Sequence, residues 1–129
     1  MRHTSAVDAD RQLKNLVWIG SSRKDLKAFP EEVKDAMGYA LFQAQLGRKA
    51  PQARPLAGFG GAGVLEIVED FQTNTYRAVY TVRFSDFVYV LHVFQKKSKK
   101  GIATPKADMD LIRSRLRLTQ QDYKLRFRS

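Results

Sequence analysis

The segment from Thr75 to Gln95 constrains the fold of this chain more than any other. Its two halves, Thr75 to Arg83 and Phe87 to Gln95, are rich in valine, tyrosine, phenylalanine and threonine. These residues favour β-strands. The three residues between the halves are too few for a crossover, so the strands must be antiparallel neighbours. The second half leads directly into lysines at 96, 97, 99 and 100, so the sequence predicts a stiff hairpin that ends in positive charge.

The remaining elements surround this hairpin. Apolar residues 16–19 predict a first strand, and a helical spacing of three and four predicts a helix from Pro30 to Leu46 after a shorter one at 23–29. Another strand is predicted at 64–70, and Pro105 suits the start of a final helix. The order is β-α-α-β-β-β-α. It predicts an α+β fold in which a helical hairpin packs on one face of a small, mainly antiparallel four-stranded sheet.

The domain organisation follows from the two ends of the chain. Residues 1–14 are polar and predict a flexible N-terminal extension, and residues 15–118 form the folded domain. Residues 119–129 are basic, with Tyr123, Leu125 and Phe127 in alternation. They predict either an extra strand or a tail that orders on a partner.

The charge balance indicates a polyanionic partner. The 129 residues include 23 Lys and Arg against 13 Asp and Glu, for a formal charge of +10. Nucleic acid, an acidic protein or an anionic membrane surface would each suit such a surplus, and simple solubility is the alternative. Cysteine is absent, which excludes disulfides and thiolate catalysis. No apolar run approaches the roughly 20 residues of a membrane helix, and the polar start lacks a signal core, so we expect a cytoplasmic protein.

The candidate site lies on the hairpin. Side chains alternate along a strand, so Arg77 and Arg83 are expected on one face, and Val88, Val90, His92, Phe94 and Lys96 on one face of the next strand. An exposed arginine beside Lys96 or Lys97 would form a cationic pocket for a phosphodiester. Crowded lysines lower one another's pKa, so one of them could serve as a base. The alternative is a solvated lysine turn. His92 is interpreted as a hydrogen-bonded core residue, and neither a metal nor a cofactor is expected.

Several of these pieces resemble one toxin family. The matching pieces are LEI at 65–67, YRAVY at 76–80, VYVLHVFQKKSKK at 88–100, and TP at 104–105 followed by a helix that starts with acidic residues. Residues 18–47 agree with the same pattern. Over about residues 16 to 118 the chain resembles the RelE/HigB-type toxins of bacterial type II toxin–antitoxin modules, and most of all their phage-derived Gp49-like branch.

The resemblance implies a RelE-like fold and a metal-independent endoribonuclease that cuts mRNA, usually on the ribosome, by attack of a 2′-hydroxyl on the adjacent phosphate. It implies that Arg77 contacts the scissile phosphate and that Lys96 and Lys97 bind RNA and assist proton transfer, with Tyr123 as a candidate acid or stacking group. The implied partners are mRNA, the ribosome and a cognate antitoxin, usually of helix-turn-helix type, in a hetero-oligomer. Further basic residues are expected to bind RNA: Arg83, Lys99, Lys100, Arg113 and Arg117.

Two other hypotheses stay open. The first is a basic RNA- or ribosome-binding module that does not cut. The second is a phage protein that regulates its host through an acidic protein target. Steep salt dependence would accompany RNA binding with or without cleavage, so affinity alone does not separate the first from the nuclease.

Overall fold

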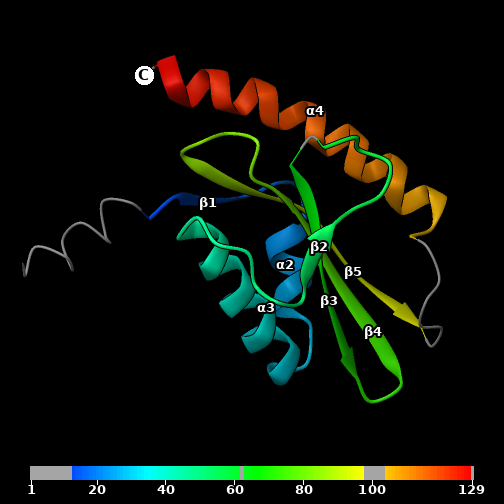
Figure 1. Ribbon diagram of the computed structural model, residues 1–129. Helices are drawn as coiled ribbons and strands as arrows, with labels where there is room; N and C mark the ends of the chain where they lie inside the picture. The colour runs from blue at the N-terminus through cyan, green and yellow to red at the C-terminus, as the bar shows by residue number, and fades with distance from the viewer. Residues whose placement is uncertain (1–12, 62, 98–103, 129) are drawn as a thin grey trace, which may run out of the picture.

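The computed structural model describes residues 13–61, 63–97 and 104–128, and it has the predicted α+β class (Figure 1). Among these residues, no helix is long and apolar enough to cross a membrane. The elements in chain order are β1 (Asn15–Trp18), α2 (Ser22–Lys27), α3 (Glu31–Gln45), β2 (Ala53–Pro55), β3 (Val64–Phe71), β4 (Asn74–Thr81), β5 (Phe87–Lys97) and α4 (Lys106–Arg128).

The sheet has five strands rather than the predicted four, and it is mixed. Its order is β1-β5-β4-β3-β2, with β1 parallel to β5 and every other pair antiparallel. The additional strand, β2, lies between the predicted helix that ends at Leu46 and the predicted strand at 64–70, where the sequence analysis expects no helix or strand. Its three residues are too few to show a pattern, and Pro55, which has no N–H, is tolerated because β2 is an edge strand.

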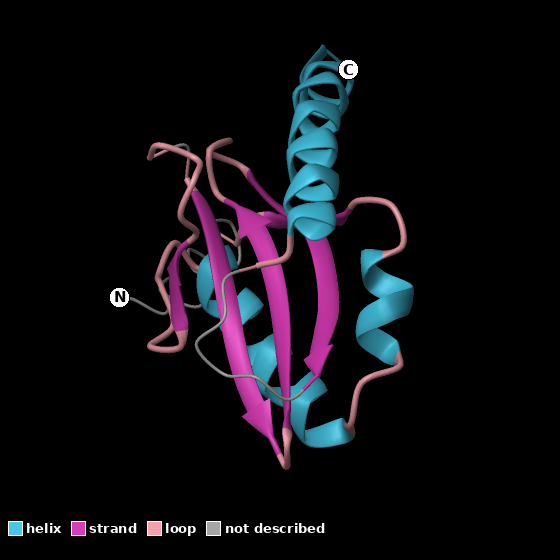
Figure 2. Cartoon of the chain, turned by 90° about the vertical axis from the view of Figure 1, so that its right-hand side faces the viewer, coloured by secondary structure: helices cyan, strands magenta, loops and turns pink. Residues whose placement is uncertain are grey.

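Helices cover both faces of the sheet, not one as predicted (Figure 2). The short α2 packs against β5 and α3 against β3 and β5, whereas α4 packs against β5 from the opposite side. Helices α2 and α3 therefore pack on the sheet separately and do not form the predicted helical hairpin. Residues 75–81 of β4 are all buried, as expected for a strand covered on both faces.

Two apolar clusters hold these layers together. The cluster under α3 includes Met37, Leu41, Ile67, Tyr80 and Val90, and the cluster under α4 includes Val79, Tyr89, Leu91 and Ile112. Leu65 and Ile67 both belong to the α3 side, as the alternation of β3 predicts.

The final helix continues to Arg128, so residues 119–128 are helix and not the predicted tail or strand. Ile112 and Thr119 are buried, and Leu116 and Tyr123 pack on the same cluster. Their spacing of three and four turns one helical face to the sheet. This inward contact outweighs the alternation of residues 123–127, which had suggested a strand.

A β-bulge in β5 decides which side chains share a face. Tyr80 pairs with Val90 and Val79 pairs with His92, so Leu91 is an extra residue between two ladder positions. Alternation restarts after it. Val88 and Val90 consequently face α3, while three later residues of β5, His92, Phe94 and Lys96, face the α4 side. The expectation that all five share one face is wrong, because ideal alternation takes no account of a bulge.

A contact from α4 satisfies the bulge. The Nη1 of Arg115 donates to the carbonyl oxygen of Leu91 at 2.9 Å. Room for this guanidinium comes from Gly20, whose φ is +59° and where an added Cβ would lie 2.7 Å from Arg115 Cζ. Arg115 is thus fixed against the sheet.

Candidate functional site

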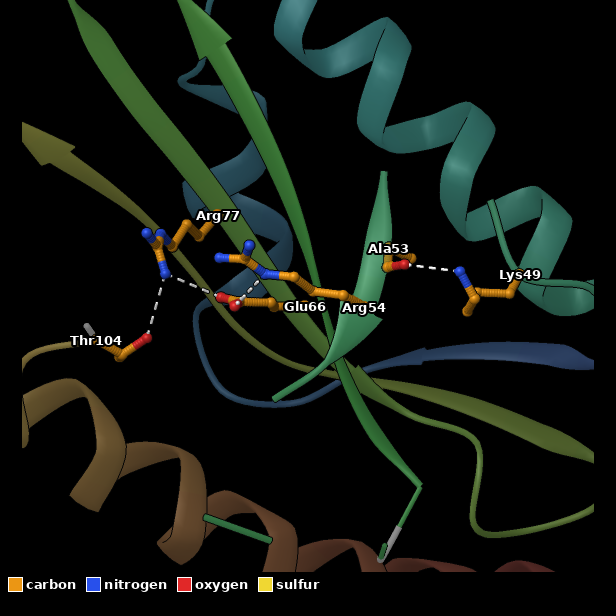
Figure 3. A network of polar contacts seen from close by, with 6 residues as sticks. All are labelled: Lys49, Ala53, Arg54, Glu66, Arg77 and Thr104. Carbon is orange, nitrogen blue, oxygen red and sulfur yellow. Dashed lines mark hydrogen bonds and ion pairs between the residues drawn. The ribbon is translucent and has the colours of Figure 1, made fainter. Parts of the chain in front are cut away.

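Arg77 lies in the middle of β4 and is buried, with 4% of its surface exposed. Its Nη1 donates to the Oε1 of Glu66 at 3.0 Å, and Glu66 on β3 is equally buried (Figure 3). The sequence analysis considered an arginine on an exposed face. Instead, Arg77 is buried and forms an ion pair with the buried Glu66.

A second arginine shares the same carboxylate. Arg54, on the edge strand β2, donates from Nε to the Oε2 of Glu66 at 2.9 Å, and its side chain is 60% exposed. Thr104 Oγ1 approaches Arg77 Nη1 at 3.5 Å just before α4 (Figure 3). The Glu66 carboxylate therefore orients one buried and one exposed guanidinium.

Lys96 lies on the same face of the sheet as Arg77. It pairs with Thr75, two residues from Arg77 along β4, so the two cationic side chains leave neighbouring strands on one side. Desolvation of the amine and, second, the positive charge of Arg77 lower the pKa of Lys96, while Asp108 and Glu66 oppose this effect. The amine of Lys96 therefore loses its proton more readily than that of an ordinary lysine.

A histidine–carboxylate pair lies beside Lys96. His92 Nε2 is 2.7 Å from Asp108 Oδ1 in the first turn of α4, and its ring stacks on Phe94 with centroids 4.7 Å apart. His92 is buried, and its Nδ1 has no hydrogen-bond partner within the described part of the chain. The prediction of a packed, hydrogen-bonded histidine is confirmed.

Together these residues make a compact polar cluster on the α4 side of the sheet. It contains three cations, Arg54, Arg77 and Lys96, and the carboxylates of Glu66 and Asp108. Such a cluster can bind an anion through its exposed Arg54 and half-buried Lys96, and it can stabilise charge through the buried pair. Its acid–base candidates are Lys96 and His92.

Other predicted site residues lie elsewhere. Arg83 is exposed beyond the opposite end of β4, six residues from Arg77 and thus on the order of 20 Å along the strand. Tyr123 stacks on Phe84 with centroids 4.5 Å apart and meets the ring of Phe87 edge-on, near the start of β5. The structure does not bring Arg83 or Tyr123 together with Arg77 and Lys96.

The remaining basic residues are distributed over α4 and the segment before it. Arg113 lies over the ring of Phe59, 5.4 Å from its centroid, and Arg117 is exposed. Lys97 ends β5, but its side chain lies outside the described residues, as do Lys99 and Lys100. Their predicted contacts with RNA therefore stay predictions.

Glu66, Arg54 and Asp108 were missed by the sequence analysis. One signal was available for Glu66, because a carboxylate flanked by apolar residues on a strand next to an arginine-bearing strand favours a buried pair. Arg54 gave no signal, since β2 itself was not predicted. Asp108 was noted in the sequence only as one of the acidic residues at the start of the last helix, and not as a partner of His92.

The fold and the cluster define a small basic α+β domain with a polar, mainly cationic site on one face of a mixed sheet. A family model, described as phage derived protein Gp49-like (DUF891), matches residues 24–117. This match spans more than two thirds of the chain, which therefore belongs to the Gp49-like family. The family is a toxin-like family of toxin–antitoxin systems, as the resemblance predicted. Comparison with curated proteins and with solved structures gave no match.

Proposed function

We propose that this protein is the toxin of a type II toxin–antitoxin system and acts as a metal-independent endoribonuclease on mRNA that is being translated. The family supports a toxin with a cognate antitoxin. The charge of +10 supports a polyanionic substrate. The observation that carries the proposal is the bulge at Leu91, which puts Lys96 on the same face of the sheet as Arg77.

In the proposed reaction, the 2′-oxygen of a ribose attacks the adjacent phosphorus, and its proton passes to the neutral amine of Lys96. The bond from phosphorus to the 5′-oxygen breaks, and this oxygen takes a proton from water. The products are a 2′,3′-cyclic phosphate and a 5′-hydroxyl. Arg54 binds the phosphate from the exposed side, and Arg77 stabilises the negative charge that develops. Glu66 holds both guanidinium groups in place.

The test compares Lys96→Gln with the wild type and with Lys24→Gln, a matched loss of an exposed lysine on the far side of the sheet. Induced wild-type protein should arrest growth and cleave mRNA in a translation extract, with cut sites mapped by primer extension and cyclic-phosphate ends. Lys96→Gln should lower cleavage by roughly 100-fold or more, the scale of general-base catalysis. Lys24→Gln should leave cleavage unchanged. Full cleavage by a soluble, folded Lys96→Gln variant would remove the mechanism.

The burial of Arg77 against Glu66 favours a second candidate, an RNA-binding module that does not cut. In that case the ion pair is structural, and the exposed Arg54 and the half-buried Lys96 only bind phosphate. RNA that is bound by the purified protein but stays intact in the translation extract supports this second candidate. The same extract with and without ribosomes also tests whether cleavage depends on translation.

A further inference from the structure

Three exposed leucines form a line along α4. Leu111, Leu118 and Leu125 are separated by seven residues each, and their exposed fractions are 36%, 49% and 68%. Residues seven apart lie on one side of a helix, with a drift of about 20° per heptad. We call these three residues the leucine stripe.

The leucine stripe is separate from the side of α4 that packs on the sheet. Ile112, Leu116, Thr119 and Tyr123 already fill the inward side. Figures 1 and 2 show α4 as an outer layer, with one side against the sheet. A single exposed leucine needs no explanation. Three exposed leucines at heptad spacing match the pattern by which one helix of a coiled coil packs on another. Their exposure increases toward the end of the helix.

The positions around the leucine stripe identify the kind of helix that would fit. Ser114 and Gln121, three residues after the first two leucines, are exposed and complete the seam with small or polar side chains. Arg117 and Lys124, one residue before Leu118 and Leu125, are exposed cations at the flank of the seam. Flanking charges of this kind select a partner by opposite charge.

Charge also opposes a second copy of this chain as the occupant. Each copy carries +10, and Arg117 and Lys124 would face cations of the same kind across a symmetric seam. The nearby carboxylates are already committed within α4, because Asp110 pairs with Lys106 and Asp122 with Arg126. A partner helix with acidic residues at these positions would instead be attracted by Arg117 and Lys124.

We propose that the leucine stripe binds an amphipathic helix of another protein, which presents apolar residues at heptad spacing with glutamate or aspartate at its flanks. The stripe lies on the outer layer, apart from the Arg77–Lys96 cluster. Binding there does not depend on RNA cleavage, and each proposal can fail without the other.

The test uses two labelled synthetic peptides of about three heptads. Both carry leucine at the seam positions. One has glutamate at the flanks and the other has lysine. Fluorescence anisotropy with the full chain should show binding of the glutamate peptide and at least tenfold weaker binding of the lysine peptide. The variant Leu118→Gln/Leu125→Gln should weaken binding of the glutamate peptide by roughly tenfold or more, a loss of about 1.4 kcal/mol.

The control is Leu13→Gln, because Leu13 is 38% exposed but lies before β1 and not on α4. It should bind the glutamate peptide as the wild type does. Arg117→Glu/Lys124→Glu should reverse the preference between the peptides, and circular dichroism should show an unchanged fold in every variant. Wild-type affinity in the double-leucine variant would overturn the proposal, as would failure of both peptides to bind. Leucine-dependent dimers in sedimentation, without peptide binding, would assign the stripe to a second copy.

Discussion

At the scale of single residues, the shared carboxylate of Glu66 is the feature with the clearest consequences. A buried ion pair stabilises a fold weakly compared with an apolar pair, but the loss of one partner leaves an uncompensated buried charge. Arg77 and Glu66 are both buried, whereas the side chain of Arg54 is 60% exposed. The two salt bridges of one glutamate should therefore differ greatly in energy.

We predict that Glu66→Gln lowers the free energy of unfolding by about 3–5 kcal/mol, because Arg77 stays charged and buried. Arg54→Gln should cost less than about 1 kcal/mol, as for other solvent-exposed pairs. Urea denaturation followed by circular dichroism measures both. Equal losses in the two variants would contradict the difference in burial.

The double variant Glu66→Leu/Arg77→Met separates structure from chemistry. Two apolar side chains of similar volume should recover most of the stability that Glu66→Gln loses. The double variant should nevertheless lose cleavage, because it lacks the Arg77 guanidinium that stabilises the negative charge.

The amine of Lys96 gives a pH prediction. Desolvation and then Arg77 lower its pKa, so its neutral form is populated at lower pH than for an exposed lysine. If this form is the base, cleavage should rise with pH, by about tenfold per pH unit below the Lys96 pKa, and then level off. Asp108 raises this pKa, so Asp108→Asn should move the midpoint to lower pH.

The matched control for this shift is Asp110→Asn, since Asp110 is exposed and pairs with Lys106 on α4. It should leave the midpoint in place. A pH profile that Asp108→Asn does not move would exclude Lys96 as the titrating base.

At the scale of elements, the bulge in β5 connects the fold to the site. Without the extra residue Leu91, strict alternation would put Lys96 on the α3 side with Val90, away from Arg77. A bulge leaves ladder groups unpaired, and Arg115 supplies a donor to the Leu91 carbonyl at 2.9 Å. One arginine of α4 thus supports the strand geometry on which the site depends.

We predict that Arg115→Met costs about 1–3 kcal/mol of stability, because the Leu91 carbonyl would lose its donor. Cleavage should also fall, since the bulge would be less well fixed. Arg117→Met, two residues along α4 and exposed, should change stability by no more than about 0.5 kcal/mol. Denaturation measures the stability of both variants, and primer extension measures cleavage by Arg115→Met. An equal loss of stability in the two variants would contradict the role of Arg115.

At the scale of the whole molecule, the positive charge should govern RNA affinity. For single strands, the slope of log affinity against log salt is about −0.7 for each phosphate that a cation neutralises. We predict that Lys96→Gln reduces the magnitude of this slope by about 0.7, whereas Lys24→Gln on α2 leaves it unchanged. Filter binding of a short single-stranded RNA over a range of salt concentrations measures the slopes. A smaller slope in the Lys24 variant would show that RNA binds by overall charge and not on the α4 side.

Much of the fold could be predicted because local pattern reports local structure. The valine- and tyrosine-rich runs of β4 and β5 and the helical spacing of α3 each lie within one element, and each was found. The helix predicted to end at Leu46 has its C-cap there, and Gly47 follows with a φ of +82° while Arg48 N donates a hydrogen bond to Gln43 O. The short edge strand β2 and the last turns of α4 were missed, because contacts with distant residues stabilise them.

The candidate site was likewise predicted in part from the sequence and in part only from the structure. The sequence by itself determined that Arg77 and Lys96 lie on neighbouring antiparallel strands and that the chain is strongly basic, because these properties follow from residue type and short spacing. Only the tertiary structure decided that Arg77 is buried against Glu66, that α4 covers the second face, and that Lys96 shares the face of Arg77. The physical reason is that burial and the bulge at Leu91 depend on packing between elements far apart in the chain, where residue spacing carries no information.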